Sequence, residues 1–558
     1  MLMFFKKYRY YLNSLINHRR FLNKKILWKT LKGTFYARIL RVPRVRNCQM
    51  ALTFYCNHKC TYCSSSLLLK KREYEMSETD WYNTVDQLKN LGCTHFDITG
   101  GEPSLVGQKK LCDLIKYINH KRDSVVSLAT NGKVLDINWL LRLKESGLTA
   151  LELNLQSVDE AYHDEVCQAP GNYKKIMSLI EMARSVDLNV CINTCLGVGN
   201  WHHIEKLMDW CEEKKMHCLL NLAAPTGELV GEFVRIEELK EKYYNLLFSH
   251  YYSRSDTSYN YRGFDMCPGG IEKLYITCYG DVMQCTFCQI SFGNILKEPL
   301  SVIHRRFISN PLIRKREICK QTFNKIFQED WVQPAINNQH PPMSLFKHPL
   351  YEGVIETNIS DHNYRKSLGF LYQYLVKRKG DIIIKLLKKR LNPQQGLCGL
   401  DVGCGYGQYT RYLRDKTEHS IYAVEPNREL RKIANEENRV LAGENINKNQ
   451  DFDFSYVINV LHHARDPVQL LKDMNEVTTG IIIISELNRK NPFVRWYIQL
   501  RMAWENYRTH FDDGEVEDLI SYAGLMIVDQ FQSNLLGIPA VYNWFVAINR
   551  NARVPIDN

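Results

Sequence analysis

The sequence predicts an α/β protein: a partial (βα)6 TIM-like barrel with a small cysteine-rich extension, followed by a Rossmann-like domain. Three observations predict this fold class. Residues 49–225 repeat a short apolar run and a helix-length segment about every 30 residues, residues 262–320 carry spaced cysteines, and a second strand–helix series begins near residue 396. Repeated strand–helix units form parallel sheets, and the active sites of such folds lie at the carboxyl ends of the strands.

The expected barrel strands are short apolar runs that end in polar or glycine-rich sequence: 50–55, 95–99, 125–129, 150–155, 189–195 and 218–223. Between them lie segments with a period near 3.6, as in 77–91. There Ser77 is the expected N-cap, and Gly92 ends the helix. The second series offers strands at 397–402, 420–424, 454–459 and 480–485.

A chain of 558 residues is too long for one hydrophobic core. We expect a basic N-terminal extension (1–48), the barrel (49–261), the cysteine-rich extension (262–324), a proline-containing linker (325–365) and the second α/β domain (366–558).

The net charge of +12 is concentrated at the N-terminus, where residues 1–48 hold thirteen Lys or Arg and no Asp or Glu. Such an arm can bind anionic lipid or nucleic acid, whereas the plainer interpretation is a solvated helical extension packed on the barrel. No apolar run is long enough to cross a bilayer, and the first residues lack a signal-peptide core, so we expect a cytoplasmic protein. Without export, eighteen cysteines favour metal binding over disulfides.

The first expected strand ends in CNHKCTYC, which places Cys56, Cys60 and Cys63 on one short loop. Three thiolates there can each ligate one iron of a 4Fe–4S cluster, which leaves the fourth iron open to substrate. A zinc knuckle is the alternative, but no fourth Cys or His follows at zinc-finger spacing. His58 is interpreted as a spacer inside the loop.

This motif resembles that of the radical S-adenosylmethionine (SAM) superfamily, over about residues 49–320. The resemblance implies a 4Fe–4S cluster and SAM as cofactors. It also implies that the turn Gly100, Gly101, Glu102 and Pro103 binds the methionyl amine of SAM, with Glu102 as a contact. The remaining SAM-site candidates follow later strands or the cysteine loop: Tyr62 near the adenine, the turn 130–132, Asn154 and Gln156 in the places of a family Ser-x-Asp, and Asn193 with Thr194.

The implied chemistry is reductive cleavage of SAM to methionine and a 5′-deoxyadenosyl radical, which abstracts a hydrogen from an unactivated carbon. The electron would come from an external donor such as flavodoxin or ferredoxin. A small molecule, a sugar or a peptide can be the substrate.

The next segment resembles the auxiliary-cluster extension, of SPASM or shorter twitch type, that follows many radical SAM barrels. Cys267, Cys285 and Cys288 are the implied ligands, with Cys319 as a candidate fourth. Cys278 lies in a strand-like run and is interpreted as a small buried hydrophobe. Zinc on the same thiolates is the alternative.

The second domain opens with GLDVGCGYGQYT, an apolar strand that runs into Asp401 and the glycines Gly403 and Gly405. The next strand ends in Glu425, where an acid can hold ribose hydroxyls; this spacing alone also fits a dinucleotide site. With the later FDFSYVINVLHHARDP, the segment resembles class I SAM-dependent methyltransferases over about residues 370–550. The resemblance implies that Asp401, Gly403, Gly405 and Glu425 bind SAM, that Glu444 contacts adenine and that Asn459 lies beside the cofactor.

His462 and His463 would face the methyl acceptor, where one of them can act as a general base, and Glu486 is a similar candidate. The alternative is that these are structural loop residues.

The sequence therefore predicts a bifunctional enzyme in which radical hydrogen abstraction is coupled to SAM-dependent methyl transfer. One alternative is a radical SAM dehydrogenase, epimerase or peptide maturase whose degenerate methyltransferase domain only binds. Another is an iron–sulfur electron-transfer or scaffold protein.

Overall fold

The computed structural model describes residues 24–34, 44–63, 65–69, 74–197, 199–222, 242–243, 246–248, 269–286, 289–309, 343–344, 369–391, 396–464, 466–494, 496, 511 and 514–550. The chain divides into two compact units, Met1–Glu352 and Gly353–Asn558. Among the described residues, no helix combines the length and the apolar character that a membrane span requires. The finer domain boundaries given above stay predictions.

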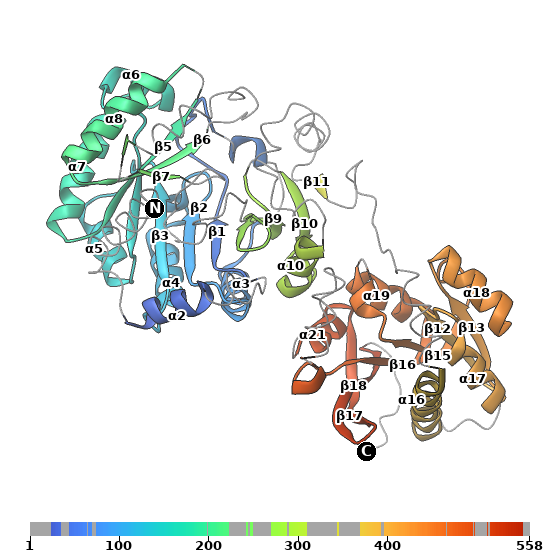
Figure 1. Ribbon diagram of the computed structural model, residues 1–558. Helices are drawn as coiled ribbons and strands as arrows, with labels where there is room; N and C mark the ends of the chain where they lie inside the picture. The colour runs from blue at the N-terminus through green and yellow to red at the C-terminus, as the bar shows by residue number, and fades with distance from the viewer. Residues whose placement is uncertain are drawn as a thin grey trace. The chain divides into compact units, whose positions relative to one another are not determined.

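The first unit is built on a sheet of eleven strands in the order β11-β10-β9-β8-β1-β2-β3-β4-β5-β6-β7 (Figure 1). Its parallel strands are β1 (Asn47–Ala51), β2 (His95–Thr99), β3 (Val125–Thr130), β4 (Ala150–Asn154), β5 (Val190–Leu196), β6 (His217–Leu222) and β7 (Leu246–Phe248). The helices between them are α3 (Glu78–Asn90), α4 (Gln108–Asn119), α5 (Ile137–Glu145), α6 (Glu160–Cys167), α7 (Asn172–Ser185) and α8 (Trp201–Glu213). Two short 3-10 turns are η2 (Ser65–Leu68) and η3 (Pro103–Val106).

Alternation along the strands separates an apolar face from a polar one. Phe96 and Ile98 of β2 are fully buried in the core that the helices cover, whereas Asp97 between them is partly exposed on the opposite face. Helix α3 starts as predicted: Ser77 and Asp80 form a capping box that satisfies two free backbone donors.

The first strand lies earlier than expected. The predicted strand 50–55 is wrong at both ends, because β1 spans Asn47–Ala51 and pairs in register with His95–Thr99. Residues 52–55 leave the regular ladder and run alongside the turn that follows β2, with Leu52 N donating to Thr99 O at 3.0 Å.

The cysteine-rich extension continues the barrel sheet, which the sequence pattern did not show. Strand β8 (Lys273–Ile276) pairs in parallel with the other edge of β1, and β9 (Asp281–Met283), β10 (Ile290–Asn294) and β11 (Met343–Ser344) follow outward. Helix α10 (Leu300–Ser309) comes after β10. Next to this junction a buried ion pair joins Arg46 to Glu272 at 3.5 Å.

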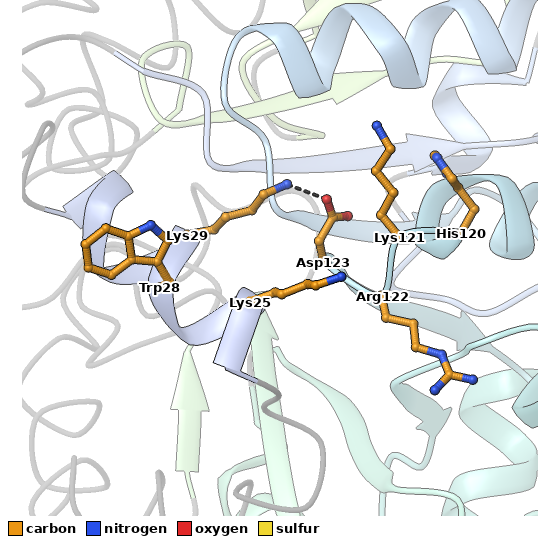
Figure 2. Close-up of a pocket in the computed structure, with 7 residues that line it drawn as sticks. All are labelled: Lys25, Trp28, Lys29, His120, Lys121, Arg122 and Asp123. Carbon is orange, nitrogen blue, oxygen red and sulfur yellow. Dashed lines mark hydrogen bonds and ion pairs between the residues drawn. The ribbon is translucent and has the colours of Figure 1, made fainter.

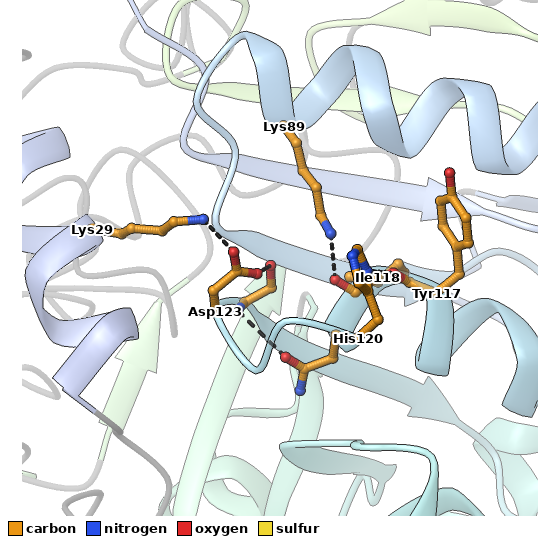
Figure 3. A network of polar contacts seen from close by, with 8 residues as sticks. Lys29, Lys89, Tyr117, Ile118, His120 and Asp123 are labelled. Carbon is orange, nitrogen blue, oxygen red and sulfur yellow. Dashed lines mark hydrogen bonds and ion pairs between the residues drawn. The ribbon is translucent and has the colours of Figure 1, made fainter.

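Helix α2 (Lys24–Thr34) and residues 44–48 are the described parts of the basic extension. Ile26 is 3% exposed, and Lys29 forms an ion pair with Asp123 at 2.5 Å (Figure 3). For these residues the plainer interpretation, a helix packed on the barrel, agrees with the structure. Residues 1–23 lie outside the described part.

The second unit is a seven-stranded sheet in the order β14-β13-β12-β15-β16-β18-β17. Strands β12 (Cys398–Val402), β13 (Ser420–Val424), β14 (Ala442–Gly443), β15 (Phe452–Ile458) and β16 (Thr478–Leu487) are parallel, and β17 (Leu525–Leu535) and β18 (Ile538–Asn549) form an antiparallel edge. The helical elements are α16 (Gly369–Arg390), α17 (Gln408–Lys416), α18 (Arg428–Asn438), η7 (Leu461–His463), α19 (Pro467–Val477) and α21 (Glu515–Tyr522). The strand order reverses between β12 and β15, which is where open α/β sheets bind ligands.

Candidate functional site

The glycine turn after β2 holds the segment that leads into the cysteine loop. Gly101 N donates to Thr53 O at 2.7 Å, and Glu102 N donates to Tyr55 O at 2.8 Å. A Cβ on Gly100 would lie 2.2 Å from Thr53 O, and one on Gly101 would lie 2.4 Å from Tyr55 O. Only glycine permits this approach, so the pair positions the backbone directly before Cys56.

Glu102 is fully buried, and its carboxylate braces two turns. Oε1 accepts hydrogen bonds from Ser104 N (3.0 Å), Ser104 Oγ (2.5 Å) and Thr130 Oγ1 (2.7 Å), while Oε2 accepts one from Asn131 N (2.8 Å). Pro103 begins the 3-10 turn that Glu102 caps. Because Oε1 already accepts three hydrogen bonds and Oε2 accepts one, only Oε2 keeps a free acceptor position for a ligand. Its role as a SAM contact stays a prediction.

The three thiols of the cysteine loop are unpaired. Cys56 Sγ accepts from His58 N at 3.4 Å and from Asn131 Nδ2 at 3.7 Å. Burial raises the pKa of Cys56 to about 11, whereas a hydrogen bond with the Cys167 side chain, helped by His58, lowers the pKa of Cys60 to about 5. In the part of the chain that the structure describes, no three His, Cys, Asp or Glu side chains are grouped closely enough to hold a metal ion. Three free thiols on one loop are nonetheless the donor set that an open-site 4Fe–4S cluster uses.

Tyr62, Asn154 and Gln156 form one hydrogen-bonded chain across the carboxyl ends of the strands. Asn154 Nδ2 donates to the Tyr62 hydroxyl at 2.8 Å, and Gln156 Nε2 donates to Asn154 Oδ1. Gln156 Oε1 in turn accepts from Cys195 N at 3.0 Å and from Thr194 Oγ1 at 3.3 Å. The structure thus brings these predicted residues together.

Asn193 belongs to a different group, on the polar face of the sheet. It donates to Glu152 Oε2 at 3.4 Å and accepts from Asn221 Nδ2 at 2.7 Å. On the same face Asp97 accepts from Ser127 Oγ at 2.9 Å. Carboxylates, amides and a hydroxyl therefore follow β2 to β6, which suits a substrate with hydrogen-bonding groups.

Of the residues proposed for an auxiliary cluster, only Cys285 is described; it is partly buried just after β9. Cys267, Cys288 and Cys319 lie outside the described residues. Cys278 is fully buried among Phe54, Tyr275 and Tyr279, and burial raises its pKa. This placement agrees with its interpretation as a small buried hydrophobe.

The glycine loop of the second unit lies between β12 and α17. Gly405 has a φ of +57°, and a Cβ there would meet nothing within 4 Å, so its outer side is open to a ligand. Glu425, at the end of β13, accepts from Gly405 N at 2.8 Å and from Asn427 N at 2.9 Å. Each carboxylate oxygen therefore holds one backbone donor and keeps a free acceptor position. Burial is the main cause that raises the pKa of Glu425.

Asp401 lies beneath this loop rather than on its open side. It is 3% exposed, and Oδ2 accepts from Thr410 Oγ1 at 2.5 Å. Burial raises its pKa to about 7. Gly403 (φ +73°) packs against Val460, because a Cβ there would lie 2.5 Å from Val460 Cγ1. Both residues shape the loop from within the protein.

Glu444 and Asn459 lie on either side of this loop. Glu444 is exposed and pairs with Arg431 at 3.3 Å. Asn459, with a φ of +56°, donates its backbone N–H to Ser485 O at 2.7 Å. Its Oδ1 is buried and has no hydrogen-bond partner among the described residues. A buried oxygen of this kind costs about 1–3 kcal/mol and suits a ligand donor.

His462 and Glu486 form a buried pair beside the glycine loop. His462 Nδ1 lies 2.7 Å from Glu486 Oε2, and Glu486 Oε1 accepts from Leu461 N at 2.9 Å. The two side chains are 5% and 2% exposed. The His463 ring lies 4.1 Å from that of His462 between centroids. A carboxylate that fixes one imidazole nitrogen orients the other as a proton acceptor.

Comparison with known proteins identifies both units. Residues 50–211 match the sequence model of the radical SAM superfamily, and residues 372–530 match that of a methyltransferase domain. The chain therefore carries a radical SAM domain and a methyltransferase domain, and it is an enzyme. The radical SAM family implies a 4Fe–4S cluster and SAM, so these two predicted cofactors are confirmed, and the auxiliary cluster stays a prediction.

Two of the curated relatives illustrate what the chain is similar to. The PqqA peptide cyclase of Rhizobium meliloti is 25% identical over 312 residues, which is 50% of this chain and 76% of that protein. The AdoMet-dependent heme synthase of Nitratidesulfovibrio vulgaris is 23% identical over 286 residues, 46% of this chain and 77% of that protein.

Among solved structures, Streptococcus suis SuiB bound to the precursor peptide SuiA has a TM-score of 0.39 at 18% identity and covers 49% of this chain and 66% of its own. A Thermotoga maritima SAM-dependent methyltransferase has a TM-score of 0.28 at 18% identity, over 34% of this chain and 95% of its own. The chain thus spans slightly less than two thirds of the SuiB chain.

Sequence reasoning missed Ser157 and Asp159, although Ser157-Val158-Asp159 is itself a Ser-x-Asp, three residues after the positions Asn154 and Gln156. Ser157 Oγ accepts from Asp159 N at 3.0 Å and lies 2.9 Å from His203 Nδ1, while Asp159 caps α6. The string itself was the signal that could have found them.

Proposed function

We propose that this protein is a bifunctional enzyme that cleaves SAM reductively in its first unit and transfers the methyl group of a second SAM in its second unit. One observation carries the proposal: a single chain combines three free thiols beside a braced glycine turn with a second glycine loop that faces a buried His–Glu pair. The two reactions need separate SAM molecules, because one requires cleavage of the bond to the adenosyl carbon and the other requires cleavage of the bond to the methyl carbon.

In the first unit Cys56, Cys60 and Cys63 would hold the 4Fe–4S cluster. When bound and reduced by an external donor such as flavodoxin or ferredoxin, the cluster supplies the electron that converts SAM to methionine and a 5′-deoxyadenosyl radical. Gly100 and Gly101 hold the cysteine loop in place, and the Tyr62–Asn154–Gln156 chain lines the edge of the sheet. The polar face with Glu152 and Asn193 would orient the substrate.

In the second unit Gly405 and Glu425 would hold the ribose and Asn459 would accept a hydrogen bond from the ligand. His462, oriented by Glu486, would take the proton of the methyl acceptor. Such a base matters for an acceptor such as a hydroxyl, which is a poor nucleophile until it loses its proton.

We propose a peptide as the substrate class, since the Rhizobium meliloti relative is named a peptide cyclase. A peptide supplies backbone amides that match the amides and carboxylates of the polar face. The alternative substrates are a small molecule and a sugar, and the assay described next distinguishes them from a peptide when each is offered as substrate.

The test is to measure both fates of SAM in one anaerobic, reduced sample. Wild type should yield 5′-deoxyadenosine and S-adenosylhomocysteine and bind two SAM per chain. If 5′-deoxyadenosine forms but only one SAM binds and no methyl group is transferred, the protein is a radical SAM enzyme whose second domain is degenerate. Two bound SAM without either product would support a scaffold instead.

A second, auxiliary cluster is proposed on Cys285 with Cys267, Cys288 and Cys319. Reconstituted wild type should then hold about eight irons, and Cys285→Ala/Cys288→Ala should lose about half of them. Four irons together with one zinc in wild type would show a zinc module in this segment.

A further inference from the structure

A concave pocket of about 460 Å³ lies between α2 and the turn that joins α4 to β3 (Figure 2). Helix α2 contributes Lys25, Trp28 and Lys29, and the turn contributes residues 120–123. This volume is within the range of small-molecule sites, about 300–1,000 Å³. Neither SAM site uses these residues.

The lining of the pocket carries a surplus of positive charge. Its one acidic residue, Asp123, is already paired with Lys29 at 2.5 Å. Among the described residues, Lys25 and Lys121 have no acidic partner, and Arg122 adds a further cation. A ligand that fills this space would therefore be anionic.

Stabilisation of a helix end explains only part of this arrangement. Residues 120–122 follow the carboxyl end of α4, where cations are favourable, and Lys89 Nζ donates to Ile118 O at 2.6 Å in the same place (Figure 3). That effect does not account for Lys25 and Trp28, because both come from a separate helix. The indole of Trp28 is 68% exposed at the rim of the pocket.

The pocket lies at the opposite end of the sheet from the cysteine loop. The turn 120–123 precedes β3, whereas Cys56 follows the carboxyl end of β1. Parallel strands of five or six residues separate these ends by about 17–20 Å. A ligand of this pocket is therefore distinct from the SAM that is cleaved.

We propose that this pocket binds a nucleoside polyphosphate, with its phosphates on Lys25 and Lys121 and its base on the Trp28 ring. Lysine ammonium groups bind phosphate as point charges, and an exposed indole offers a flat face on which a base can stack. The exposed aromatic ring of Trp28 favours a ligand with a base over bare phosphate or an acidic chain.

The test measures binding of ATP by isothermal titration calorimetry to the full chain with both SAM sites saturated by S-adenosylhomocysteine. Lys25→Glu/Lys121→Glu should weaken ATP binding at least tenfold. The control Lys206→Glu/Lys215→Glu makes the same charge change on exposed lysines at α8 and should bind ATP as wild type does. Circular dichroism and 5′-deoxyadenosine formation check that each variant is folded.

Trp28→Ala distinguishes the two parts of the ligand. It should weaken ATP binding and leave pyrophosphate binding unchanged. The role of the base would be overturned if Trp28→Ala weakened the binding of ATP and pyrophosphate equally, or if it weakened the binding of neither. The proposal would be overturned if wild type did not bind ATP, or if the pocket variant and the control variant bound ATP equally. Tighter binding of hexaglutamate than of ATP would overturn it in favour of an acidic peptide.

Discussion

Each unit places a glutamate just after its second strand, and the two carboxylates are used differently. Glu102 is fully buried and accepts four hydrogen bonds from its own and a neighbouring turn, whereas Glu425 accepts two backbone donors and is 6% exposed. The adjoining glycines differ in the same way: Gly101 is packed against backbone, and Gly405 faces open space. The same sequence sign therefore precedes a glutamate with four protein donors in the first unit and one with two in the second, and both remain predicted SAM contacts.

The largest effect that separates the two units is expected from Cys60→Ala. Loss of one of the three loop thiols should abolish 5′-deoxyadenosine formation, measured by chromatography of the reduced anaerobic reaction. Methyl transfer to a pre-formed acceptor should persist. Cys112→Ala, a partly buried cysteine of α4, is the matched control and should retain both products. Unchanged 5′-deoxyadenosine in Cys60→Ala would contradict the assignment of the loop.

Glu102→Ala tests the brace. Four donors would lose their acceptor in a buried place, so the free energy of unfolding of the first unit should fall by roughly 4 kcal/mol. Urea denaturation measures this change. Glu425→Ala leaves two donors without an acceptor at a less buried place, so it should lower the free energy of unfolding of the second unit by less. Equal losses would remove the distinction between the two acids.

Asp401→Asn should change how stability of the second unit depends on pH. Burial raises the folded-state pKa of Asp401 to about 7, above its unfolded value of about 3.9. The folded state then binds the extra proton between these values, so wild-type stability falls as pH rises from about 4 to about 7, by roughly 4 kcal/mol. Urea denaturation at several pH values, without SAM, should show this decline in wild type and a flatter curve in the variant. Parallel curves would show that folding does not raise the pKa of Asp401.

The smallest effect is expected from Glu425→Ala on binding. Loss of its free acceptor positions should raise the Kd of the second site for SAM about tenfold, or about 1.4 kcal/mol. Calorimetry should show this change in one of two binding events, with 5′-deoxyadenosine formation intact. A parallel loss of 5′-deoxyadenosine in a folded protein would contradict separate sites.

Local sequence was enough to predict the bounds of those elements whose determining residues lie next to one another in the chain. The bounds of β2 and β13 match the predicted 95–99 and 420–424, and Ser77 caps α3 through the neighbouring Asp80. The pairing of β8 with β1 could not be predicted, because its partners are about 225 residues apart and neither strand exceeds five residues.

The same distinction holds in the sites. The sequence indicated His462 and Glu486 separately as catalytic candidates, but their 2.7 Å contact arises only when β16 lies beside β15. Glu102 was predicted as a SAM contact from the resemblance of its turn, and its partners Thr130 and Asn131, which follow a different strand, could not be predicted from local sequence. A motif shows which residue types meet at a strand end and not which of their hydrogen bonds the protein itself already uses.

The position of β1 between β2 and β8 has a consequence for synthesis on the ribosome. Among the described residues, its second edge pairs with residues 273–276, which are made about 225 residues after Asn47. At about 5–20 residues per second, that edge waits roughly 11–45 seconds as unpaired backbone next to a loop of three free thiols. During this interval the unpaired edge of β1 can form hydrogen bonds with other strands, until β8 is synthesised and pairs with it.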